Sequence, residues 1–188
     1  LRRDVKVVDG TYQTDHGEVP YRLCYSKDTN MTMKYPSVLF APGQTVNFDR
    51  WTIDCARLAD QGYVTFIKGR TGANYPEWEE EVTKALQTMK TFSFIDVERI
   101  AAIASSFGNQ EIQSYGLENP RDLKSYIALS TFNNPWVMLG SLEPFDIPTM
   151  LLSGGGEEPV AGRDCDHDAY VWSQEFSEKM QQENSKYY

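Results

Sequence analysis

A serine flanked by small residues marks the point in this sequence where covalent chemistry is most strongly indicated. The segment 104–108 reads Ala-Ser-Ser-Phe-Gly, and it follows an apolar run and precedes a helical stretch. It fits the pattern G-x-S-x-G with alanine in place of the first glycine, and small residues on both sides accommodate a sharp strand-to-helix turn. The positive end of the following helix would point at the serine. We therefore predict Ser106 as a nucleophile; the structural alternative is a loop serine that caps a helix.

Strands and helices alternate on both sides of this serine. Short apolar runs predict strands at 19–25, 36–41, 63–67, 99–104, 125–130 and 147–152, and apolar residues at helical spacing predict helices at 51–59, 76–89, after Ser106 to about Asn119, and 168–183. Such alternation favours an α/β fold with a mostly parallel, doubly wound sheet and helices on both faces. Ligands of such sheets bind at the carboxyl ends of the strands, which is where Ser106 falls.

Length and composition exclude several classes of protein. The 188 residues suggest one domain spanning 1–188. The net charge is −9 and there is no basic run, which argues against nucleic acid as a partner. No apolar run approaches the ~20 residues needed to cross a bilayer, so no membrane span is predicted. A glycosylation triplet at Asn30-Met31-Thr32 is compatible with secretion and supports it only weakly.

Four stretches of the chain resemble the α/β-hydrolase superfamily, and within it the compact esterases that include dienelactone hydrolases and cutinase-like polyester hydrolases. The stretches are YPSVLFAPGQT (35–45), LADQGYVTFI (58–67), FIDVERIAAIASSFG (94–108) and IPTMLLSGGGEEPV (147–160). The resemblance runs from about Val19 to the C-terminus. It implies the α/β-hydrolase fold, a serine esterase with a catalytic triad, and no cofactor. The chain ends where the last strand of that fold would begin.

The same resemblance implies an oxyanion hole made of two backbone N–H groups. One belongs to Phe107, the residue after the nucleophile. The other belongs to Gln44, which follows Pro42-Gly43 at the end of the predicted strand 36–41. Each such donor is worth about 10²–10³ in rate. A plain turn is the alternative for this Pro-Gly-Gln-Thr segment.

The triad acid is expected just after the strand 147–152. Two neighbouring carboxylates, Glu157 and Glu158, fit this place, and glutamate is accepted there as an alternative to aspartate. Counting forward from the strand favours Glu157, and counting back from Pro159 favours Glu158. We slightly prefer Glu157, and the alternative is that both are solvated loop carboxylates.

The general base has two candidate positions. The chain holds two histidines, and only His167 follows the acid as the order Ser, acid, His requires; His16 precedes the nucleophile. Relatives place a helix between the acid and the histidine, whereas here the predicted helix 168–183 follows His167. Either His167 lies on a loop that folds back over Ser106, or the catalytic histidine is not part of these 188 residues.

Two further features of the sequence bear on binding. Alternating aspartates at 164–168 have the spacing of a calcium loop, but Ala169 occupies the position that needs glycine, so we predict no metal site. Trp136 follows the predicted strand 125–130, which comes after the helix that starts at Ser106. This places it at the rim of the expected cleft, and we predict that it contacts substrate.

Two hypotheses follow. In the first, the protein hydrolyses small-molecule or polymeric carboxylic esters through an acyl-enzyme on Ser106. The short stretch between Ser130 and Ile147 would leave an open cleft that suits exposed or bulky esters, including polymers. In the second, it is an inactive hydrolase-fold protein that binds ligands, or a remnant without the catalytic histidine. Labelling by a serine-directed phosphonate separates the two.

Overall fold

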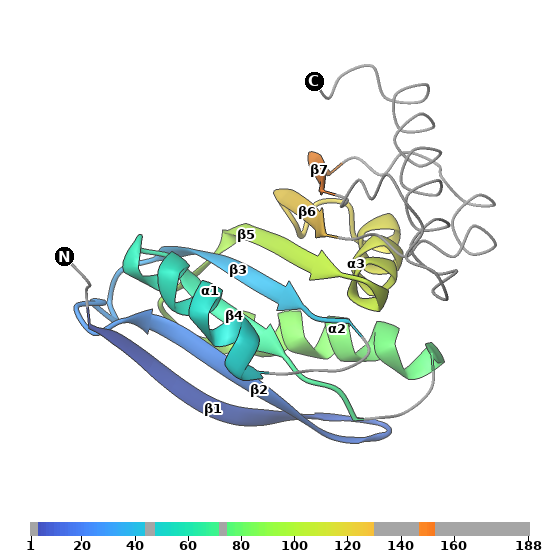
Figure 1. Ribbon diagram of the computed structural model, residues 1–188, viewed down its shortest axis with the longest axis horizontal. Coiled ribbons are helices and arrows are strands. Elements are labelled where there is room, and N and C mark those ends of the chain that lie inside the picture. The colour runs from blue at the N-terminus through green and yellow to red at the C-terminus, as the bar shows by residue number, and fades with distance from the viewer. Residues whose placement is uncertain (1–3, 44–47, 72–74, 130–146, 153–188) are drawn as a thin grey trace, which may run out of the picture.

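The computed structural model describes residues 4–43, 48–71, 75–129 and 147–152, without the side chains of 75–79 and 151 (Figure 1). The strands are β1 Val5–Thr14, β2 Gly17–Ser26, β3 Tyr35–Ala41, β4 Val64–Lys68, β5 Ile95–Ser105, β6 Ser125–Leu129 and β7 Thr149–Leu152. The helices are α1 Phe48–Asp60, α2 Tyr75–Thr91 and α3 Phe107–Glu118.

The strands form one seven-stranded sheet in the order β1-β2-β4-β3-β5-β6-β7. The pairs β1–β2 and β2–β4 are antiparallel, and all later neighbours are parallel. Parallel neighbours require crossover connections. Within the described residues, α1 connects β3 to β4, α2 connects β4 to β5, and α3 connects β5 to β6. The mostly parallel α/β architecture predicted from the sequence is therefore confirmed.

Helices cover both faces of the sheet, α1 on one and α2 with α3 on the other (Figure 1). Successive side chains of β3 point to opposite faces of the sheet, so this strand contributes apolar residues to the core on both faces. Val38 and Phe40 pack with Cys55 and Ala59 of α1. The opposite face carries the larger apolar cluster, in which α2 contributes four fully buried side chains: Val82, Ala85, Leu86 and Met89.

The sequence prediction missed β1. Its apolar residues do not alternate cleanly, and most of the strand is exposed or half-buried. Among the described strands, β1 is an edge of the sheet and pairs with β2 alone, from Val5 opposite Ser26 to Thr14 opposite Gly17. Its position comes from that hairpin rather than from a buried face, so its sequence carries a weak periodic signal.

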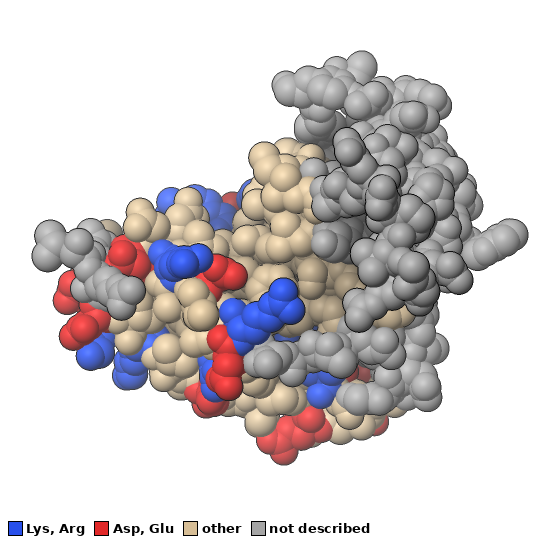
Figure 2. Space-filling model, viewed as in Figure 1, with Lys and Arg blue, Asp and Glu red and all other residues tan. Residues whose placement is uncertain are grey.

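The face of the described chain seen in Figure 2 mixes both signs of charge. In the view of Figure 2, lysine and arginine side chains lie among aspartates and glutamates over the described elements, with no basic stripe. None of the described helices has the length and apolar character needed to cross a membrane.

Candidate active site

Ser106 occupies a strained turn between β5 and α3. Its backbone lies at φ 50° and ψ −125°, and it is the only non-glycine residue with positive φ in the described part of the chain. A conformation of this kind costs an L-residue about 1–3 kcal/mol and persists only where its surroundings impose it. Although Ser106 stands at the N-cap of α3, its side chain makes no capping hydrogen bond. The helix-capping alternative for this serine therefore loses its support.

Small residues allow the turn to form. Ala104 lies opposite Ala41 of β3 on one side and Ala128 of β6 on the other. On the helical side of the turn, a Cβ on Gly108 would fall 1.9 Å from the carbonyl oxygen of Ala41. Position 108 therefore requires glycine, whereas Ala104 is fully buried and its methyl group fits among the neighbouring alanines. This explains why the first glycine of the motif can be alanine here and the second cannot.

Polar contacts from β6 hold the turn in place. The Leu129 carbonyl accepts from the backbone N–H of Ser106 at 3.3 Å and from the Asn109 side chain at 3.0 Å. The Tyr126 hydroxyl in turn donates to Asn109 Oδ1 at 2.6 Å. Burial raises the pKa of Tyr126 well above its ordinary value, so this hydroxyl stays a neutral donor.

The end of β3 lies directly against Ser106. A Cβ on Gly43 would fall 2.9 Å from Ser106 Cβ and 3.4 Å from Ser106 Oγ. The segment Pro42-Gly43 thus runs beside the serine hydroxyl, and Ser106 is half-buried. The structure therefore brings the end of the strand predicted at 36–41 against the turn at Ser106.

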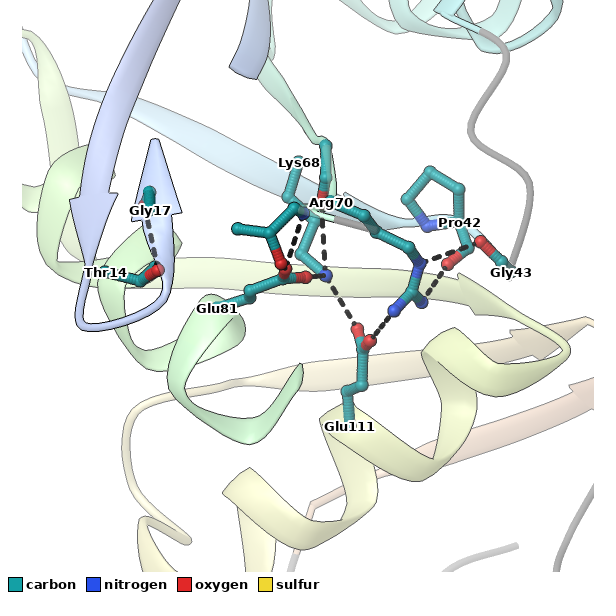
Figure 3. A network of polar contacts seen from close by, with 10 residues as sticks. Thr14, Gly17, Pro42, Gly43, Lys68, Arg70, Glu81 and Glu111 are labelled. Carbon is teal, nitrogen blue, oxygen red and sulfur yellow. Dashed lines mark hydrogen bonds and ion pairs between the residues drawn. The ribbon is translucent and has the colours of Figure 1, made fainter. Parts of the chain in front are cut away.

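Four buried charged side chains lie behind this junction (Figure 3). Arg70, just after β4, donates through Nε to the Gly43 carbonyl at 2.9 Å and through Nη2 to the Pro42 carbonyl at 2.8 Å. Its Nη1 is paired with Glu111 of α3. The side chain of Arg70 is 5% exposed and that of Glu111 is 1% exposed.

Lys68 and Glu81 complete this buried cluster. Lys68 Nζ lies 3.0 Å from Glu81 Oε2 and 3.0 Å from Glu111 Oε2. The other oxygen of Glu81 accepts from the backbone N–H and the hydroxyl of Thr71 at 2.8 and 2.9 Å. Two cations thus face two carboxylates. Burial raises the pKa of Glu111, while the charges of Lys68 and Arg70 act in the opposite direction.

The sequence prediction did not find this cluster, although one signal was present. Residues of a strand alternate between its two faces, so Lys68 shares a face with the buried Val64 and Phe66. Arg70 lies two residues after Lys68, just beyond β4, where the same alternation would place it on the same face. Glu81 has a similar signal, because it falls at helical spacing with the buried Val82, Ala85 and Met89 of α2. Only the packing of α2 and α3 brings Glu81 and Glu111 together at this point.

Several predicted site residues lie outside the described residues: Gln44, Trp136, Glu157, Glu158 and His167. Their roles stay predictions. Within the described ranges the only histidine is His16, in the β1–β2 turn, where Nε2 lies 3.8 Å from Glu80 Oε2 of α2. Among those same residues no group of three or more His, Cys, Asp or Glu side chains is arranged to hold a metal ion.

No protein-family model matches the chain, and no curated protein sequence matches it either. Solved structures do match. A hyperthermophilic esterase from the archaeon Pyrobaculum calidifontis aligns with 95% of this chain and 71% of its own, at TM-score 0.70 and 13% identity. A protein described as m3DLH aligns with 93% of this chain and 78% of its own, at TM-score 0.66 and 18% identity.

The chain spans less than half the length of other proteins that it matches. One is a prolyl endopeptidase, of which it covers 21% at TM-score 0.55 and 15% identity, with 68% of this chain aligned. At such identities the likeness shows the fold alone. The described chain has an α/β-hydrolase-like fold.

Proposed function

We propose that the chain is a serine hydrolase that cleaves carboxylic esters through an acyl-enzyme on Ser106. The observation that carries the proposal is the strained backbone of Ser106, at φ 50°. The Ser106 side chain makes no capping hydrogen bond to α3, and it lies against Gly43. Backbone strain of this kind clusters at active sites and ligand-binding sites, which supports a functional role for Ser106.

The proposed reaction has two halves. Ser106 Oγ attacks the ester carbonyl and gives its proton to a general base, for which His167 is the candidate, oriented by Glu157 or Glu158. The backbone N–H groups of Phe107 and Gln44 would stabilise the oxyanion. The alcohol then leaves with a proton, and water hydrolyses the acyl-enzyme.

The proteins of similar fold and the sequence resemblance both bear on the substrate class. Proteins with the same fold are named as esterases and as a prolyl endopeptidase, so esters and amides both belong in the test. Within the esters, the resemblance to cutinase-like enzymes and the short stretch 130–146 favour an open cleft, with Trp136 at its rim, that takes exposed or polymeric esters.

The test uses a fluorophosphonate probe together with p-nitrophenyl esters of increasing acyl length and a prolyl p-nitroanilide. We expect stoichiometric labelling and ester hydrolysis, both abolished in Ser106→Ala, while Ser105→Ala keeps them. A folded wild-type sample that neither labels nor hydrolyses any substrate would overturn the proposal and favour an inactive binding protein. Turnover of the anilide alone would replace the ester with a peptide substrate.

A further inference from the structure

We infer that Arg70 is a positioning residue for this reaction, which fixes the backbone beside Ser106 by holding the carbonyls of Pro42 and Gly43. The inference rests on the proposed function. Its basis is geometric: one guanidinium reaches two successive carbonyls, at 2.8 and 2.9 Å, and a carboxylate of the helix that begins at the nucleophile (Figure 3).

The contact with Gly43 bears on the oxyanion donor through covalent geometry. A peptide unit is planar and trans, so its C=O and N–H point in opposite directions. The carbonyl of Gly43 and the N–H of residue 44, the predicted donor, belong to one such unit. A group that fixes the carbonyl therefore also limits the direction of that N–H.

The shape of the arginine side chain suits this position. Its planar fork presents five donors in fixed directions, whereas a lysine ammonium is a compact point charge that would not reproduce the separate Nε, Nη1 and Nη2 contacts of Arg70. Because the guanidinium is buried, solvent weakens its contacts little. Because the fork is planar and rigid, each hydrogen bond costs little conformational entropy.

Glu111 connects this contact to the nucleophile. It lies on α3, which starts at Phe107 directly after Ser106, and it is paired with both Arg70 and Lys68. The pair Arg70–Glu111 therefore joins the backbone of Pro42-Gly43 to the helix that carries the serine. Behind it, Glu81 fixes Thr71 and Lys68, so the segment that bears Arg70 is held from α2 as well.

The test compares Arg70→Lys with Arg22→Lys. The first variant keeps the positive charge of the buried cluster and loses the fork. The second removes a fork elsewhere: Arg22 contacts Asp9 through two nitrogens, at 2.7 and 2.9 Å. Titration with the phosphonate gives the concentration of active sites, so that kcat per site and KM are measured free of any loss of folded protein.

We expect Arg70→Lys to lower kcat per titrated site by about 10²-fold, the effect of one misdirected oxyanion donor, with KM changed by less than about threefold. Arg22→Lys should keep the wild-type kcat per site. If Arg70→Lys does not fold, the double variant Arg70→Gln with Glu111→Gln keeps the cluster neutral, and the same fall in kcat is expected.

Two results would count against Arg70. Wild-type kcat per site in the Arg70 variant would overturn the positioning role and leave the proposed function standing. A rise in KM alone would show uniform binding and would also overturn it. Failure of the proposed function looks different, because the wild-type protein itself would then show no labelling.

Discussion

Gly43 and Ser106 lie so close together that no side chain fits between them: a Cβ on Gly43 would stand 2.9 Å from Ser106 Cβ. The contact joins the end of β3 to the turn after β5, two strands that are neighbours in the sheet and far apart in the sequence. Glycine is needed here for space, because Gly43 is not among the residues with positive φ.

Substitution of Gly43 by alanine should therefore affect activity more than folding. The added methyl group would push the serine or the strand end aside, and a displacement of about 1 Å can cost 10²-fold in rate. We expect kcat/KM for p-nitrophenyl esters, and the rate of phosphonate labelling, to fall by about 10²-fold.

Gly62→Ala is the matched control. Gly62 follows α1 at φ +94°, and a Cβ there meets nothing within 4 Å, so alanine strains the backbone without approaching the site. It should lower the urea midpoint and keep the labelling rate of the folded protein. Equal labelling rates for Gly43→Ala and wild type would contradict the expectation.

The strain at Ser106 predicts an order of stability among variants of that position. Glycine adopts φ 50° without steric strain, whereas alanine is strained there by its Cβ. Ser106→Gly should therefore be more stable than Ser106→Ala by about 1 kcal/mol. The measurement is urea unfolding followed by circular dichroism. At Ser105, in β5 with no positive φ, the order should reverse, because glycine weakens a strand. The same order at both positions would argue against strain at Ser106.

The buried cluster should depend strongly on Lys68. Lys68→Met leaves two carboxylates to share one guanidinium, in a region where Lys68, Glu81 and Glu111 have side chains no more than 1% exposed. Removal of one partner from a buried ion pair typically costs about 3–5 kcal/mol. The double variant Lys68→Met with Glu81→Gln restores neutrality and should recover part of that loss in urea unfolding. A double variant less stable than the single one would show that charge balance is not the cause.

Asp122 should make stability depend on pH in the acid range. Burial opposes ionisation, but hydrogen bonds from Lys90 and Tyr115 hold the pKa of Asp122 below its ordinary value of 3.8. A lowered folded-state pKa contributes stability above the ordinary value, and that contribution is lost as the pH falls through the folded-state value.

Thermal unfolding between pH 6 and pH 2.5 tests this contribution. The difference in Tm between wild type and Asp122→Asn should narrow as the pH falls below about 4. Tyr115→Phe removes one of the donors and should weaken the same pH dependence. A difference in Tm that stays constant down to pH 2.5 would contradict the role of the Asp122 charge.

The sequence by itself determined most of the described elements and the position of the sharp turn at Ser106. Apolar runs and helical spacing located β2 to β7 and the helices α1, α2 and α3. Each of these elements has a buried face, and its apolar residues recur with the period of a strand or of a helix. The small residues Ala104 and Gly108 located the turn at Ser106 for the same local reason. The sequence did not predict the edge strand β1, because the position of β1 depends on its pairing with β2.

Only the tertiary structure decided what surrounds Ser106. No periodicity indicates that Arg70 reaches the carbonyls of Pro42 and Gly43, or that Glu81 and Glu111 meet Lys68 between α2, α3 and the sheet. Such contacts join residues from four separate elements, and their geometry is set by how those elements pack. A local pattern records which side of its own element a residue occupies, whereas its partner across the fold is fixed by packing alone.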